Sequence, residues 1–294
     1  IKRTSLSTYR SQRRGGRGVQ GASSREEDFV EHLFVANTHS YILFFTDKGK
    51  CYWVKVYDIP EGGRAAKGRA IVNLIGCEPD EKVSAFISVK EFNEDHYVVM
   101  ATEKGMVKKT KLSAYSNPRK KGIYAVEIRD GDKLIEARVS TGDNDILLGT
   151  RNGKSIRFSE EQIRASGRKT MGVKGITLSS EDDRLVGMLL IKREGTVLVA
   201  TEKGFGKRTE ISQYRAQKRG GKGVLTMKTT DKVGKMVTIK EVVDKDDLMI
   251  ITNQGVLIRL PVAQIRSIGR ATQGVKLIKL GEGTLVSSIT RIMS

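Results

Sequence analysis

Short runs of β-forming hydrophobic residues recur along the chain, in pairs separated by a polar four-residue turn. The run Tyr41–Phe45 is apolar throughout, and the run Cys51–Val54 follows it after the turn. Each turn has the form Thr-x-x-Gly, and its final glycine supplies the positive φ angle that a tight hairpin needs. These turns occupy residues 46–49, 102–105, 150–153, 201–204 and 252–255. The pattern predicts five β-hairpins.

A glycine-containing loop follows each hairpin. The sequence contains six such loops but only five hairpin turns. Its reference glycines are 50 to 54 residues apart, at positions 18, 68, 122, 172, 223 and 274. Residues 2–18 align without a gap with residues 207–223, so we expect the chain to begin inside the turn of a first hairpin. The apolar segment 285–289 resembles segment 185–189, and we expect it to adjoin the first unit. About six units are therefore predicted.

Six β-rich units of about 50 residues predict an all-β fold, a six-bladed propeller-like disc that forms a single domain over residues 1–294. In such a disc each sheet buries its faces against its neighbours, and closure of the ring protects the strand edges. Only four prolines occur, which suits continuous strand ladders. An open solenoid of the same units is the structural alternative.

The net charge of +19 is confined to the loops around the reference glycines. We define six basic loops: residues 10–18, 64–69, 119–121, 164–174, 215–222 and 266–276. They contain 21 of the 53 Lys and Arg residues and no Asp or Glu, which leaves 32 basic and 34 acidic residues elsewhere. A merely solvated surface tolerates carboxylates among its cations, so their absence favours a binding site for an anionic partner.

Equivalent loops of a repeat disc occupy equivalent places, so the basic loops are expected to form a ring of positive potential around the rim. Spaced clusters of Lys and Arg on a curved rim suit the phosphates of a bent or wrapped DNA duplex. Single strands need aromatic platforms, which the basic loops lack, and the sequence shows no basic amphipathic helix for a membrane. Beyond the first loop the candidate DNA contacts are Arg64, Lys67, Arg69, Arg119, Lys120, Lys121, Arg168, Lys169, Lys174, Lys218, Arg219, Lys222, Arg270 and Lys276.

The first basic loop contains the most specific motif, Gln12-Arg13-Arg14-Gly15-Gly16-Arg17-Gly18. Its glycines let backbone N–H groups approach an anion, and its arginines supply forked contacts to phosphate. The motif resembles the seven-residue QRRGG[RK]G box of the DNA gyrase A subunit family. The resemblance extends over the whole chain through the six repeats and segment 26–34, and a diverged copy of the box occupies residues 217–223.

This resemblance implies a β-pinwheel, a propeller-like disc whose blades exchange strands, which serves as the carboxy-terminal DNA-wrapping domain of an ATP-dependent type II topoisomerase. It implies that duplex DNA follows the rim in a positive sense, which lets the enzyme introduce negative supercoils. The implied partners are the remaining domains of the gyrase A polypeptide and the gyrase B polypeptide, in an A2B2 complex of the bacterial cytoplasm, with ATP and Mg²⁺ held in other domains. The fragment alone is expected to be monomeric.

Two alternatives stay open. The equivalent domain of topoisomerase IV would orient DNA without strong wrapping, and the intact box disfavours it. A propeller-like scaffold for an acidic protein is the alternative outside the family, and competition by duplex DNA would distinguish it.

Other candidate chemistry has a simpler interpretation. The glycines at 16, 18 and 21 fit a dinucleotide-binding pattern, but they lie in a β-repeat instead of opening a helix. Tyr9 beside Arg10 suggests a topoisomerase nucleophile, yet the equivalent residues of other loops indicate a buried slot. These residues are Ile59, Ile163, Tyr214 and Ile265. The two cysteines and three histidines lack metal-ligand spacing, so we expect no active site, metal or cofactor in this chain.

Overall fold

The computed structural model describes residues 1–4, 36–63, 66–192, 194–254 and 257–292, and short antiparallel strands dominate it. In chain order the strands are β1 (Tyr41–Thr46), β2 (Lys50–Lys55), β3 (Val83–Val89), β4 (Tyr97–Thr102), β5 (Met106–Lys111), β6 (Ile123–Tyr124), β7 (Leu134–Ser140), β8 (Asp145–Thr150), β9 (Lys154–Ser159), β10 (Val173–Lys174), β11 (Leu185–Ile191), β12 (Thr196–Thr201), β13 (Phe205–Glu210), β14 (Val224–Leu225), β15 (Met236–Val242), β16 (Asp247–Thr252), β17 (Leu257–Pro261), β18 (Val275–Lys276) and β19 (Val286–Ile292). The described helical elements are α1 (Ile71–Ile75) and the 3₁₀ turns η2 (Val56–Asp58), η3 (Leu112–Tyr115), η4 (Glu160–Gln162), η5 (Ile211–Gln213) and η6 (Val262–Gln264).

The five predicted hairpins are confirmed as the pairs β1–β2, β4–β5, β8–β9, β12–β13 and β16–β17. In the first turn, the Gly49 N–H donates to the Thr46 carbonyl at 2.9 Å. Gly49 has a φ of 79°, and a Cβ there would lie 2.4 Å from the Val126 carbonyl oxygen. The turn therefore requires glycine for its backbone angle and for the close approach of the next repeat.

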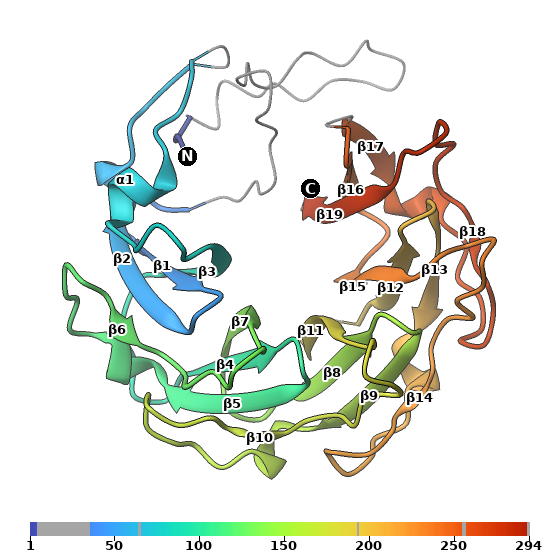
Figure 1. Cartoon of the computed structure of the whole chain (residues 1–294), viewed down its shortest axis with the longest axis horizontal. Coiled ribbons are helices and arrows are strands. Elements are labelled where there is room, and N and C mark those ends of the chain that lie inside the picture. The colour runs from blue at the N-terminus through green and yellow to red at the C-terminus, as the bar shows by residue number, and fades with distance from the viewer. Residues whose placement is uncertain (5–35, 64–65, 193, 255–256, 293–294) are drawn as a thin grey trace.

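Each hairpin is the centre of a sheet, and we name each blade after its first strand. The sheet orders are β3-β1-β2-β6, β7-β4-β5-β10, β11-β8-β9-β14, β15-β12-β13-β18 and β19-β16-β17. In the first four blades, the two-residue outer strand comes from the following repeat, so adjacent repeats exchange strands. Figure 1 shows the blades arranged around a common centre, with β3, β7, β11, β15 and β19 innermost and β6, β10, β14 and β18 at the rim.

Alternate side chains of a central strand enter different blade interfaces. On β4, Val98 and Met100 pack against the β1 blade, whereas Val99 and Ala101 pack against the β8 blade. Because successive residues of a strand point to opposite faces, a strand buried between two neighbours is hydrophobic throughout. The core is thus a series of inter-blade layers instead of one central cluster.

Residues 1–4 occupy the place that the repeat alignment predicts for them. The Ile1 N-terminal amine donates to the Arg69 carbonyl at 2.6 Å, and the Arg69 N–H donates back to Ile1 at 2.9 Å. The aligned residues Gly206 and Val275 are register partners between β13 and β18. Residues 5–35, which make up most of the predicted first unit, lie outside the described residues.

Whether the segment 285–289 adjoins the first unit stays a prediction, because residues 5–35 of that unit lie outside the described residues. This segment lies largely in β19, which pairs with β16 of its own blade, with Ile250 opposite Ile289. The last strand of each of the other described repeats likewise returns to the first strand of its own hairpin. The all-β, propeller-like disc is confirmed with five described blades, and the arrangement in Figure 1 favours it over an open solenoid.

Candidate nucleic-acid interface

The basic loops reach the rim because each one crosses from its own repeat to the edge of the preceding blade. In the β4 blade, Gly172 opens this crossing strand with a φ of 81°. A Cβ at Gly172 would lie 2.3 Å from the Val107 carbonyl oxygen, so only glycine lets the loop dock against β5. The four described outer strands lie at the periphery in Figure 1, and the preceding loop residues therefore border the rim.

A buried residue lies nine positions before the reference glycine of four of the described loops. Ile59, Ile163, Tyr214 and Ile265 are all at most 3% exposed. The predicted apolar slot is therefore confirmed at these four positions. Burial explains why these equivalent loop positions hold isoleucine or tyrosine, without a catalytic role for the tyrosine. Tyr9, the corresponding residue of the first loop, lies outside the described residues.

Most of the predicted contacts project into solvent. Ten have exposed side chains: Lys67, Arg69, Arg119, Lys120, Lys121, Lys169, Lys174, Lys218, Lys222 and Lys276. Across the described ranges, no ion pair joins any of these ten to a carboxylate. Their charge is therefore available to an external anion.

Three predicted arginines behave differently, because they are half-buried and bind backbone. Arg168 donates to the Tyr124 carbonyl at 3.2 Å, and Arg270 donates to the Leu225 carbonyl at 2.7 Å. Arg219 donates to the Lys174 carbonyl at 3.1 Å. Each acceptor lies on the outer strand of the neighbouring blade, so these arginines connect adjacent blades along the rim. A guanidinium has five N–H donors, and the remaining ones can still face phosphate.

Sequence reasoning missed an aromatic residue beside these loops. Tyr124 on β6 is 52% exposed, and the Lys169 ammonium lies 5.9 Å from its ring centroid. It lies three residues beyond the nearest basic loop, so a search confined to those loops overlooks it.

Sequence reasoning also missed two buried cations beneath the loops. Lys108 and Lys207 are at most 1% exposed, and their ammonium groups donate to loop carbonyls. Burial lowers the pKa of Lys108 to about 7, with a smaller contribution from Arg168. Burial likewise lowers the pKa of Lys207 to about 8, with Arg270 contributing. A lysine in a short strand gives no sequence signal of burial unless equivalent repeat positions are compared.

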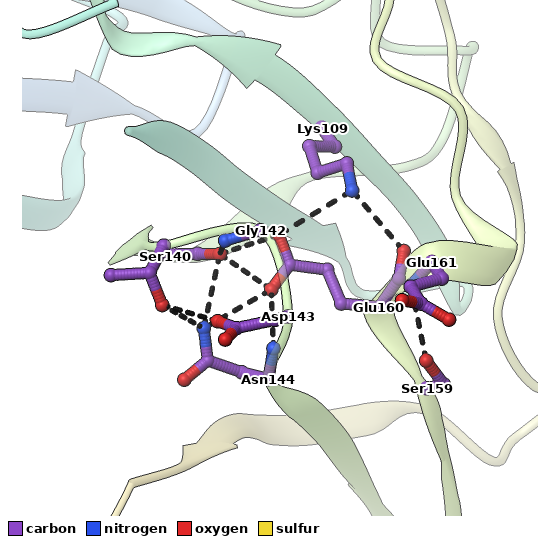
Figure 2. A network of polar contacts seen from close by, with 9 residues as sticks. Lys109, Ser140, Gly142, Asp143, Asn144, Ser159, Glu160 and Glu161 are labelled. Carbon is purple, nitrogen blue, oxygen red and sulfur yellow. Dashed lines mark hydrogen bonds and ion pairs between the residues drawn. The ribbon is translucent and has the colours of Figure 1, made fainter. Parts of the chain in front are cut away.

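Another buried cation, Lys109, has an acidic partner inside the disc. The buried Glu160 carboxylate lies 3.6 Å from the Lys109 ammonium and accepts a hydrogen bond from the Ser140 hydroxyl at 2.5 Å. Asn144 donates to the same carboxylate at 3.3 Å, as Figure 2 shows. This network joins the β4 blade to the next repeat, and its charges are neutralised within the protein.

Some predictions fall outside the structural evidence. The box Gln12–Gly18 and Arg64 lie outside the described residues, so their contribution stays a prediction. Among the described residues, no cluster of three His, Cys, Asp or Glu side chains has the geometry to hold a metal ion. The helical elements that the structure describes are all too short to cross a membrane.

Comparison with known proteins identifies close sequence relatives. The DNA gyrase A polypeptide from Staphylococcus epidermidis is 48% identical over 295 residues, which cover 99% of this chain and 33% of that protein. The corresponding protein from Staphylococcus aureus is 47% identical over the same length. The chain therefore spans about a third of the length of these relatives.

Solved structures share the fold. The C-terminal domain of DNA topoisomerase IV superposes with a TM-score of 0.83 at 26% identity, covering 99% of this chain and 90% of that one. The DNA gyrase A C-terminal domain gives 0.79 at 21% identity, covering 99% and 96%. The family model described as "DNA gyrase C-terminal domain, beta-propeller" matches six segments: residues 1–37, 40–90, 96–141, 144–192, 195–242 and 246–292. With every repeat of the chain matched in this way, the protein belongs to the DNA gyrase C-terminal domain family of β-propellers.

Proposed function

We propose that this chain binds duplex DNA along its rim and wraps it in a positive sense, as part of the gyrase A polypeptide of a DNA gyrase. One observation carries the proposal. Exposed cations of the basic loops recur from blade to blade along the rim, and those in the described residues form no ion pair with a carboxylate. Lys and Arg at such a surface exchange condensed counterions for phosphate contacts, which favours any duplex regardless of sequence.

The curvature of the rim is matched by the distribution of its charge. Bending 20–30 base pairs by 40–90° costs on the order of 1–6 kcal/mol, so a wrapped duplex needs contacts along its whole path. The described loops place exposed cations beside β6, β10, β14 and β18, which follow one another around the disc. Each cluster would hold a successive stretch of the bent duplex.

The box Gln12–Gly18 would fix the start or the end of this wrap. In the complete enzyme, the remaining gyrase A domains and the gyrase B polypeptide would form an A2B2 complex in the bacterial cytoplasm. ATP and Mg²⁺ would be used by those other domains. A positive wrap presented to the DNA-cleaving core would convert strand passage into negative supercoiling.

A topoisomerase IV domain is the second candidate, because a structure of that domain has a TM-score of 0.83 with this chain. The fold therefore does not discriminate between the two enzymes. The intact box and the 48% identity to a gyrase A polypeptide over the whole chain favour gyrase.

Duplex binding is tested by titrating the chain with a 40-base-pair DNA labelled at both ends for energy transfer. We expect the ends to approach on binding, the affinity to fall steeply with salt, and random sequences to bind equally well. Polyglutamate serves as the acidic-protein competitor and is expected to displace DNA poorly. A salt-independent affinity, or tighter binding to polyglutamate than to DNA, would refute the proposal.

A further inference from the structure

The basic loops alternate between two kinds around the disc. Every second loop has the sequence Gly-Arg-x-x-x-Gly, at residues 63–68, 167–172 and 269–274, whereas the loops between them lack it. The residue of the preceding hairpin that lies under each loop alternates in step. It is lysine beneath the Gly-Arg loops, at Lys2, Lys108 and Lys207, and it is Tyr52 or Ile156 beneath the described loops of the other kind.

Lys108 contacts the Gly-Arg loop of the next repeat from inside the blade. Its ammonium donates to the Arg168 carbonyl and to the Ala125 carbonyl, both at 2.6 Å. Ala125 directly follows the outer strand β6, so this one ammonium connects two neighbouring positions on the rim. The lysine therefore fixes the backbone from which the Arg168 side chain projects.

The same contact recurs in the other two Gly-Arg loops. Lys207 donates to the Gly269 carbonyl at 2.5 Å and also to the Arg270 carbonyl. Lys2 donates to the Gly63 carbonyl at 2.9 Å and to the Ala66 carbonyl at 2.8 Å. A contact that repeats at every second loop belongs to the architecture of the rim.

Within the described part of the chain, the ammonium groups of Lys108 and Lys207 face other cations and no carboxylate. The charged neighbour of Lys108 is Arg168, and the Tyr115 hydroxyl shares the Ala125 carbonyl with it. The charged neighbour of Lys207 is Arg270, which also faces the Tyr214 phenol. A buried cation without a counterion is costly, so these lysines oppose stability while they remain charged.

We propose that Lys108 and Lys207 are positioning residues for DNA, which hold the Gly-Arg loops in their binding conformation and place an unneutralised charge behind the phosphate-contacting surface. This inference rests on the proposed function, because the phosphates would supply the missing counter-charge. DNA would then stabilise the charged form of both lysines.

The direction of the pH effects follows from the lowered pKa values of about 7 and 8. Between about pH 7 and pH 10 the unfolded chain binds more protons than the folded chain, so these two groups increase stability as the pH rises. The DNA affinity is expected to fall as the pH rises, because deprotonation of the two lysines removes positive charge that attracts the phosphates. A purely structural role predicts no proton exchange on DNA binding.

The test uses the whole chain and a 40-base-pair duplex in isothermal titration calorimetry at pH 8. Repeating the titration in buffers of different ionisation enthalpy reports the protons taken up on binding. We expect uptake of about one proton by the unmodified chain, and an affinity about tenfold lower at pH 9 than at pH 6.5. Absence of proton uptake in a chain that binds the duplex would overturn this inference while leaving the proposed function intact.

The variant K108M/K207M removes both ammonium groups at similar side-chain length. We expect no proton uptake at pH 8, a several-fold loss of affinity at pH 6.5, and little further loss at pH 9. The matched control is I156M, at the equivalent position beneath a loop of the other kind, and we expect it to retain the uptake of the unmodified chain. Uptake that persists in the double variant would assign the proton to another group and overturn the proposal.

Discussion

Two neighbouring lysines on β5 show how the interior and the rim of this disc differ. Lys109 points to one side of the strand and meets the buried Glu160 carboxylate (Figure 2). Lys108 points to the other side and donates to carbonyl oxygens, among them that of Arg168 in a basic loop. The first charge is neutralised and supports the fold. The second stays unneutralised next to the rim, where DNA would compensate it.

The same contrast extends over the described molecule. Several hairpin cations are paired with carboxylates, as in Lys50 with Glu81 and Arg157 with Asp145. The exposed cations of the basic loops have no such partners among the described residues. The paired cations are neutralised within the protein, whereas the unpaired cations of the rim remain available to an external anion. This distinction predicts which substitutions alter stability and which alter binding.

The largest effect is expected from the box. Replacing Arg13, Arg14 and Arg17 by alanine should abolish wrapping, because these forked contacts would hold one end of the bent duplex. In the assembled enzyme, negative supercoiling should be lost while ATP-independent relaxation survives. The matched control changes the diverged copy, as K218A/R219A/K222A, and should weaken binding without abolishing the wrap. Unchanged supercoiling by the box variant would contradict this role.

Substitutions in the interior should change the stability of the protein but not its DNA binding. Glu160→Ala leaves the Lys109 ammonium buried and unpaired, so we expect a loss of about 3 kcal/mol in the free energy of unfolding, measured in urea. Glu161→Ala, at an exposed position of the same 3₁₀ turn, should change it by less than about 0.5 kcal/mol. Neither variant should alter the salt dependence of DNA binding. Equal urea midpoints for the two variants would show that the pair contributes little.

Substitutions of the exposed rim cations should change DNA binding but not the stability of the protein. The variant K120Q/K169Q/K218Q removes three unpaired rim cations, and we expect about a tenfold loss of duplex affinity at moderate salt. The slope of log K against log salt should fall in magnitude by roughly 2 to 3, close to 0.9 per lost phosphate contact. Unfolding should be nearly unchanged.

A charge-matched control distinguishes placement from net charge. The variant K48Q/K104Q/K203Q removes three cations from hairpin turns, where Lys48 donates to the Asp80 carboxylate and Lys104 and Lys203 donate to the backbone carbonyls of Asp130 and Asp231. It should retain the original salt slope. Equal losses in the two triple variants would mean that net charge alone governs binding.

The smallest effect is expected where the two regions meet. Arg219→Lys keeps the charge but loses the forked contacts to the Gln162 and Lys174 carbonyls. Because these bonds are exposed, the loss of stability should be about 1 kcal/mol or less, with an affinity change below threefold. Lys218→Arg, next to it and without such contacts, should leave both quantities unchanged. A larger effect of Lys218→Arg than of Arg219→Lys would contradict the role of Arg219 in connecting adjacent blades.

Local signals in the sequence were sufficient to predict the hairpins. The turn Thr46–Gly49 has its glycine at the position that needs positive φ, and apolar, largely aromatic runs flank it, so neighbouring residues determine the element. Strand exchange could not be deduced in the same way. The strand Val224–Leu225 has only two residues, and its partner Ser155 is about 70 positions away. Such a strand carries no periodicity.

The sequence predicted which loops form the candidate site. It did not predict which of their cations project into solvent and which bind the backbone of a neighbouring blade. Charge counting identified Arg168, Arg219 and Arg270 together with the exposed lysines, since their side chains have the same sign and spacing. Only the structure separates them, because their acceptors are carbonyl groups of another repeat. Lys108 was missed for a related reason: an isolated lysine in a strand is expected to face solvent.

The measurement that tests the central claim most directly is ligation of a nicked circular plasmid with this chain bound. After removal of the protein, the linking number reports the amount and the sign of the wrap. We predict a positive change that grows with the amount of chain bound and disappears in the box variant. An unchanged or negative linking number, at concentrations where the DNA is saturated, would contradict positive wrapping around the rim.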